Sequence, residues 1–126
     1  MSTGPELGAT GEASRTVREQ DTATAVGSGE VPVFSTPMLC ALIEDAAVAA
    51  VAGALPEGAV SVGTRIELDH LKASAVGARV RATARVTSVE GRAIGFACEA
   101  FEGDTLIGRA THTRAVVDRA RFLERL

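Results

Sequence analysis

Two carboxylates lie in the middle of the most apolar stretch of the sequence, FSTPMLCALIEDAAVAAVAGAL, which covers residues 34–55. If this stretch is a helix, the positions three and four residues from Glu44 and Asp45 are all apolar: Cys40, Ala41, Leu42, Ala47, Val48 and Ala49. An ionised carboxylate among such neighbours costs several kcal/mol unless it is paired. Glu44 is therefore a candidate general base or nucleophile. Asp45 is expected to cap, to pair with an arginine or to lie at a dimer seam.

The two histidines are the candidates for proton transfer. His70 lies in ELDHLKA, on an expected strand, and imidazole exchanges protons near neutral pH. A carboxylate could fix the orientation of the ring, and Glu44 is the possible partner. A lone strand histidine is more often a packed or surface residue, so the assignment depends on this pairing. His112, in RATHTRAVV, is the rival, and we expect it to be structural or near a dimer interface.

Thr36 and Gly63 could complete such a site. Thr36 is a possible helix N-cap, followed by Pro37 at the first helical position. It precedes Glu44 by eight residues, or ~12 Å along a helix axis, so the two can cooperate only through a substrate between them or across two subunits. Gly63 would let a backbone N–H approach a substrate oxygen, although a strand kink or bulge would also explain a glycine there.

The elements that must position these residues follow a simple order. We expect a short strand over residues 16–26, a helix from Thr36 to about Gly53, four strands and a short helical end. In the second of the four strands Val80, Ala82, Ala84 and Val86 alternate with polar residues, which is typical of one buried face. Short turns at EGR and EGD favour an antiparallel meander. A helix that is apolar all round must be wrapped, so the predicted class is α+β, with an antiparallel sheet around one long central helix: the hotdog fold.

Length and composition limit the other possibilities. The 126 residues suffice for one domain, which we place at residues 15–126 after a loose tail over residues 1–14. With four Phe and no Trp or Tyr the core would be thin, so we expect a homodimer or a tetramer. A net charge of −3 without a basic block argues against nucleic acid. The apolar run over residues 46–55 is too short to span a membrane, and the N-terminus has no secretion signal, so the expected location is cytoplasmic.

Three blocks of the sequence resemble a known group of enzymes. These blocks, FSTPMLCALIEDAA, SVGTRIELDHLKASAVG and VTSVEGRAIGFACEAFEGDTLIGRATHTRAVVDRARF, are similar in order and spacing to the hotdog thioesterases related to fluoroacetyl-CoA thioesterase. The resemblance covers about Thr16 to Phe122. It implies hydrolysis of an acyl thioester, with acyl-CoA as the expected substrate, to a carboxylic acid and a free thiol. It also implies the catalytic group Thr36, Glu44 and His70, without a metal or cofactor.

The resemblance implies the substrate contacts as well. They are Gly63, Phe34 and Arg114, the last of which could pair with a buried acid or with a ligand phosphate. In the fluoroacetyl-specific enzyme that the chain resembles, a longer, aromatic lid is expected between the first strand and the helix. This chain has only the short segment TATAVGSGEVPVF there. The resemblance therefore implies thioester hydrolysis for this chain, but it does not imply that fluoroacetyl-CoA is the substrate. Lys72, Arg79, Arg81 and Arg85 are weak candidates for contacts with the CoA phosphates.

Several alternatives stay open at this point. A hotdog hydratase or dehydratase also uses a histidine and a carboxylate, but its Asp-x-x-x-x-His pattern is not evident in the sequence. A module that binds an acyl thioester or another apolar ligand without turnover is the other rival. The sequence does not choose between a nucleophilic and a basic Glu44, between dimer and tetramer, or between CoA and a carrier protein. Cys40 and Cys98 are expected to be buried free thiols, and a disulfide between them is the alternative.

Overall fold

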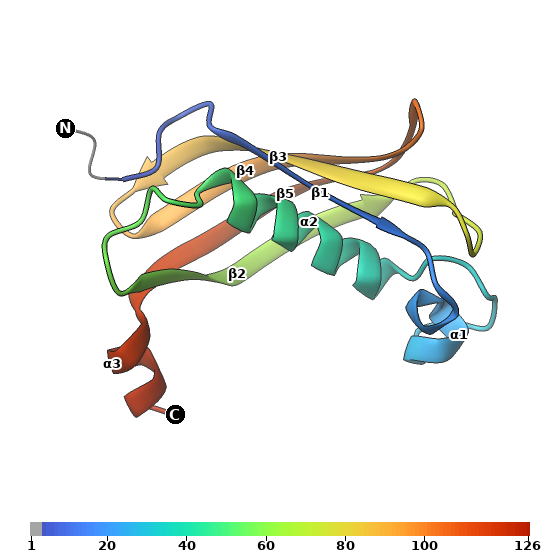
Figure 1. Ribbon diagram of the computed structural model, residues 1–126, viewed down its shortest axis with the longest axis horizontal. Coiled ribbons are helices and arrows are strands. Elements are labelled where there is room, and N and C mark those ends of the chain that lie inside the picture. The colour runs from blue at the N-terminus through green and yellow to red at the C-terminus, as the bar shows by residue number, and fades with distance from the viewer. Residues whose placement is uncertain (1–3) are drawn as a thin grey trace.

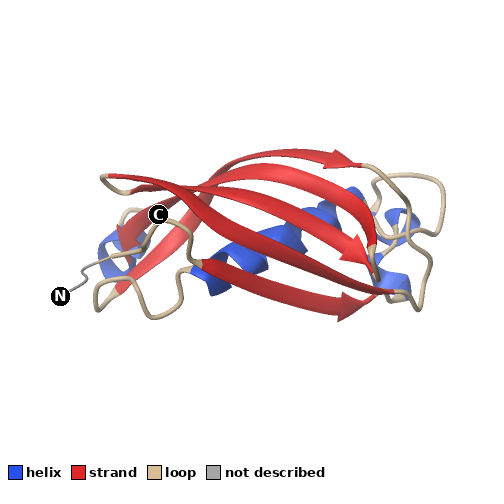
Figure 2. Cartoon of the chain, turned by 90° about the horizontal axis from the view of Figure 1, so that it is seen from above, coloured by secondary structure: helices blue, strands red, loops and turns tan. Residues whose placement is uncertain are grey.

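The computed structural model describes residues 4–126. Its elements in chain order are β1 (Thr10–Thr16), the 3-10 turn η1 (Glu19–Asp21), α1 (Ala23–Val26), α2 (Thr36–Ala50), β2 (Ala59–His70), β3 (Arg79–Glu90), β4 (Ala93–Glu102), β5 (Thr105–Asp118) and α3 (Arg119–Glu124). All strand pairs are antiparallel and form one sheet in the order β1-β3-β4-β5-β2. The sheet curves around α2 (Figures 1 and 2), so the predicted hotdog fold is confirmed.

The core lies between α2 and the inner face of the sheet. Successive side chains of a strand point to opposite faces, and the predicted inward set of β3, Val80, Ala82, Ala84 and Val86, is buried. Helix α2 contributes residues at helical spacing, among them Leu39, Ile43 and Ala46, which are fully buried. Most of these side chains are small, which allows a long helix to lie close to the sheet.

The N-terminal prediction is wrong beyond the first residues. The loose tail was expected to reach residue 14, but β1 begins at Thr10 and pairs with β3. Residues 16–26, the expected strand, instead end β1 and then form η1 and α1. A side chain at Gly11 would overlap the backbone of α2 at Ala46 and Ala50, so the glycine allows β1 to lie directly against the helix. Residues 1–3 of the predicted tail lie outside the described residues.

The predicted meander holds only for β3, β4 and β5. Strand β2 pairs with β5 and not with β3, so it forms an edge of the sheet. Within residues 4–126 nothing pairs with the outer side of β2. The hydrogen bonds of that side are therefore available to another strand.

Helix α2 is enclosed on one side only. Its inward face is buried, but Ala41, Asp45, Val48 and Ala49 are exposed, and Val48 is 44% accessible. The sheet of one chain therefore covers only the inward face of the helix, because β2 and β1 stop short of closing around it. In the described part of the chain no helix has the length and apolarity needed to cross a membrane.

Candidate active site

The start of α2 brings Thr36 and His70 together. Ser35, and not Thr36 as predicted, is the N-cap, and its Oγ accepts a hydrogen bond of 3.2 Å from the Met38 amide. Because Ser35 serves this purpose, the hydroxyl of Thr36 is free to point outward. Its Oγ1 lies 2.8 Å from Nδ1 of His70, at the end of β2. Two of the three predicted catalytic residues are therefore in direct contact.

His70 is arranged as a neutral imidazole with one nitrogen unused. Burial lowers the pKa of His70 below its ordinary value of 6.5, which favours the neutral ring. Its Nε2 is buried and has no hydrogen-bond partner among residues 4–126. The ring can thus exchange a proton with the Thr36 hydroxyl through Nδ1, while Nε2 keeps an unused hydrogen-bonding capacity within the described chain.

Glu44 lies further along the same helix and does not contact His70. Its Oε2 accepts a hydrogen bond of 3.2 Å from Nη1 of Arg114, and its side chain is 39% exposed. The predicted burial of the carboxylate and its pairing with His70 are therefore not found within one chain. The reason is the open side of α2, which leaves Glu44 reachable by solvent. The charge that compensates it comes from Arg114 on β5, which was expected to pair either with a buried acid or with a ligand phosphate.

Arg114 connects Glu44 to β2 and to His112. Its Nε and Nη2 donate to the side chain and backbone oxygens of Ser61, at 2.8 and 3.1 Å. Its Nη1 also lies 3.1 Å from Nε2 of His112. Since a guanidinium can only donate, this nitrogen of His112 is an acceptor. The other ring nitrogen, Nδ1, donates to the Arg65 carbonyl at 2.7 Å. His112 therefore has a fixed neutral tautomer, and burial, the largest influence, lowers its pKa.

His112 was expected to be structural or to lie near a dimer interface. In the structure it belongs to the network that holds Glu44, with its Nε2 3.9 Å from the carboxylate. The available signal was its spacing of two from Arg114 on β5, because residues two apart on a strand share a face. The ring also stacks on Phe96, with 5.8 Å between centroids, which limits its movement.

Gly63 allows the carboxylate to lie against β2. A side chain at this position would overlap Oε2 of Glu44 and would come within 3.3 Å of the His112 ring. The pairing of β2 with β5 also shifts register between Gly63 and Arg65. This β-bulge changes the alternation of the strand, so Gly63 and His70 both face α2 although they are an odd number of positions apart.

An open hollow of about 460 Å³ lies beside Glu44. It is lined by residues of α2, β1 and β5, including Leu42, Val48 and Arg114. Cys40 lies one turn before Glu44, with its Sγ 4.0 Å from the carboxylate. Burial and then the Glu44 charge raise the pKa of this thiol, which keeps it protonated and poorly nucleophilic. Both cysteines are free thiols, and Cys40 is partly exposed rather than buried as expected.

The remaining predicted ligand contacts lie elsewhere. The Phe34 ring is 1% exposed and packs in the core, so it presents no aromatic surface to a ligand in this conformation. Arg79 and Arg81 alternate with the buried residues of β3 and thus face away from α2. Arg79 bonds Ser14 and Thr16, and Arg81 covers the Phe101 ring. The described residues contain no cluster of three potential metal ligands.

The chain is similar in sequence to known proteins. Residues 17–120 match the family of fluoroacetyl-CoA-specific thioesterases. A fluoroacetyl-CoA thioesterase from Streptantibioticus cattleyicolor is 40% identical over 90 residues, which cover 71% of this chain and 65% of the relative. The chain belongs to the fluoroacetyl-CoA-specific thioesterase family. The aligned part is thus slightly less than two thirds of that curated relative.

Solved structures of the family match nearly the whole chain. One fluoroacetyl-CoA thioesterase superposes with a TM-score of 0.90 at 31% identity, covering 97% of this chain and 95% of the other. An alanine mutant of a fluoroacetyl-CoA-specific thioesterase, solved with fluoroacetate and CoA, superposes with a TM-score of 0.86 at 32% identity, covering 93% and 98%. The family match therefore includes the strands and helix that carry Thr36, Glu44, His70, Gly63 and Arg114.

Proposed function

We propose that this chain hydrolyses the thioester bond of an acyl-CoA, releasing a carboxylic acid and free CoA. The observation that carries the proposal is the 2.8 Å contact between Thr36 Oγ1 and His70 Nδ1. Thr36 is the first residue of α2 and is exposed to solvent. The contact joins a hydroxyl to a neutral imidazole whose second nitrogen is unpaired within residues 4–126. Membership of a thioesterase family and a relative solved with CoA support the substrate class.

Glu44 supplies the second part of the chemistry. Arg114 holds Oε2 of the carboxylate, Glu44 lines the hollow, and the only hydrogen-bond contact of Oε1 among residues 4–126 is with the Cys40 thiol at 4.0 Å. In one route Glu44 removes a proton from water, the water oxygen adds to the thioester carbon, and the C–S bond breaks as the thiolate gains that proton. In the other route Oε1 attacks the carbon, CoA leaves, and water cleaves the resulting anhydride. Single turnover in ¹⁸O-labelled water separates the routes, because only the anhydride route places the label in Glu44.

The complete site is proposed to need two chains. Strand β2 is an unpaired edge, and Val48 and Val60 beside it are exposed at 44% and 37%. Two β2 strands that pair antiparallel about a two-fold axis would form an isologous dimer and cover this surface. A pairing centred between Ile66 and Glu67 places Gly63 opposite His70 of the partner subunit. Opposed residues share a face, and both of these positions face α2.

In such a dimer the Thr36–His70 pair of one chain adjoins Glu44 of the other. This solves the separation of the groups along α2, which is ~12 Å for eight residues. The proposal does not extend to fluoroacetyl-CoA, the substrate of the relative. The segment between β1 and α2 is short, with α1 spanning only Ala23–Val26, and its single aromatic residue, Phe34, is buried, so it forms no aromatic lid. The free thiols are consistent with a reducing, cytoplasmic location, which we also propose.

A thiol-release assay over a panel of acyl-CoAs tests the activity. The wild-type chain should release free CoA, and Glu44→Gln, Thr36→Ala and His70→Gln should each lower kcat by at least about a hundredfold. Asp45→Asn is the matched control, since this exposed neighbour has no ion pair among residues 4–126, and its activity should stay near wild type. Crotonyl-CoA belongs in the panel, because loss of its enoyl absorbance without thiol release would indicate a hydratase. Tight acyl-CoA binding with no turnover by the wild type would indicate a binding module and refute the proposal.

A further inference from the structure

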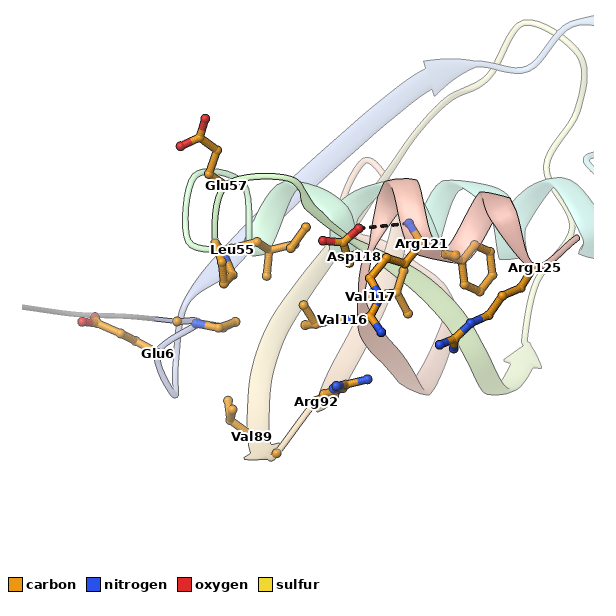
Figure 3. A pocket seen from close by; sticks show the side chains of 16 residues that line it. Glu6, Leu55, Glu57, Val89, Arg92, Val116, Val117, Asp118, Arg121 and Arg125 are labelled. Carbon is orange, nitrogen blue, oxygen red and sulfur yellow. Dashed lines mark hydrogen bonds between the residues drawn. The ribbon is translucent and has the colours of Figure 1, made fainter.

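A second cavity lies at the opposite end of α2 from Thr36. Its volume is about 800 Å³, and it forms where the loop after α2, the β3–β4 turn and α3 come together (Figure 3). Its apolar wall includes Leu55, Val89, Val116 and Phe122. It shares no lining residue with the hollow at Glu44 and is lined by none of the proposed catalytic residues, so the two are separate. Nothing in the proposed hydrolysis accounts for this cavity.

Three arginines give the cavity a positive wall. Arg92 comes from the β3–β4 turn, and Arg121 and Arg125 come from α3. None of the three forms an ion pair within residues 4–126. In Figure 3 their guanidinium groups lie on one side of the cavity, away from the carboxylates of Glu6 and Glu57. The acid beside them, Asp118, accepts the Arg121 amide as the cap of α3.

A groove joins this cavity to the site of Glu44. An intermediate hollow of about 280 Å³ lies between the end of α2 and the start of β2. It shares Val48 with the Glu44 hollow, and it shares Leu55 and Ala59 with the arginine cavity. Along β2, the distance from Gly63 to Ala59 is ~13 Å for four residues. The three hollows therefore adjoin one another through shared wall residues, from the carboxylate to the arginines, and together they are called the groove.

We propose that Arg92, Arg121 and Arg125 bind the phosphates of CoA, while its pantetheine arm lies in the groove between α2 and β2. The inference rests on the proposed function. An arm of two amides and their connecting carbons is about as long as four to five extended residues, or ~15 Å, which fits the path. Arginine pairs with phosphate through charge-assisted, bidentate hydrogen bonds. The adenine base has an apolar wall available, including Phe122, which is 38% exposed.

The test compares two substrates that differ only in the phosphate-bearing end. Acyl-CoA and the same acyl-pantetheine are assayed with wild type and with Arg92→Ala, Arg121→Ala, Arg125→Ala and the triple variant. The KM for acyl-CoA should rise at least about tenfold in the triple variant with kcat unchanged, whereas kcat/KM for acyl-pantetheine should not change. Arg119→Ala is the matched control, because this residue of α3 does not line the cavity. Helix α3 has no buried residue, and Arg92 and Arg125 are exposed, so these substitutions do not threaten the core.

Direct binding separates this inference from the proposed activity. Adenosine 3′,5′-bisphosphate should bind the wild-type chain in calorimetry, and the triple variant should lose that binding. Inorganic phosphate should bind far more weakly, and equal binding of the two would reduce the cavity to a general anion site and overturn the proposal. An unchanged KM for acyl-CoA in the triple variant, or equal losses with both substrates, would also overturn it. A chain that binds the nucleotide but hydrolyses neither substrate would refute only the proposed function.

Discussion

Charge compensation at Glu44 depends on a histidine that carries no charge. His112 gives its Nδ1 proton to the Arg65 carbonyl and offers Nε2 to Arg114. A charged imidazole would repel the guanidinium and release it from the carboxylate. Because burial lowers the pKa of His112 below 6.5, the neutral ring is favoured at neutral pH. His112 is thus a positioning residue, acting on Glu44 through Arg114.

Substitution of His112 tests this role. His112→Leu should lower kcat by roughly 10- to 100-fold with little change in KM, which is typical of groups that orient a reacting side chain. His112→Gln keeps one donor and one acceptor and should recover part of that loss. Steady-state kinetics are read beside thermal unfolding. A lower Tm with an unchanged kcat in the leucine variant would make the residue purely structural.

The pH dependence follows from His70. Its pKa is lowered from 6.5, chiefly by burial, so the ring remains neutral below pH 6.5 and gains its proton only as the pH falls through the lowered value. The kcat/KM should therefore be level near pH 8 and should fall as the pH is lowered, with a midpoint below 6.5. In His112→Gln the same midpoint should persist, since the other imidazole is then absent. A midpoint above 6.5 would contradict the assignment.

The elements divide into those with a periodic signal and those without one. Helix α2 and strands β2 to β5 carry enough buried Val, Ile, Leu and Ala to be predicted. Strand β1, of sequence TGEASRT, was missed because its inward positions include Gly11 and Ala13. Small side chains at these positions allow close packing against α2 but give no hydrophobic pattern. The N-cap of α2 was predicted at Thr36 but is Ser35, because two adjacent hydroxyl residues are equally good N-cap candidates in the sequence. The Thr36–His70 contact joins residues 34 positions apart, and local pattern cannot supply it.

The contact of β1 with α2 is testable at Gly11. Any side chain there meets the helix backbone, which cannot move without displacing the core. Gly11→Val should destabilise the protein by about 2–3 kcal/mol, as overpacking does. Glu12→Val is the control, because that neighbouring position is exposed and β-branched residues suit strands. Urea unfolding measures both variants, and similar midpoints for the two would show that β1 can separate from α2.

At the scale of the whole molecule, a site shared by two chains predicts complementation. Glu44→Gln and His70→Gln should each be inactive alone. When the two variants are mixed and allowed to exchange subunits, about half of the dimers become mixed and one of their two sites regains every group. About a quarter of wild-type activity should return, measured by thiol release after refolding the mixture. No recovery, with dimers confirmed by light scattering, would place the working groups within one chain.

The β-bulge in β2 has a consequence for how such chains can vary. It compensates the odd spacing of Gly63 and His70, so that both lie on the same surface of the strand. Loss or gain of a single residue between them would turn the imidazole away from the helix and toward the outside of the sheet. Related chains can therefore exchange most of the amino acids in this interval while the number of residues stays fixed.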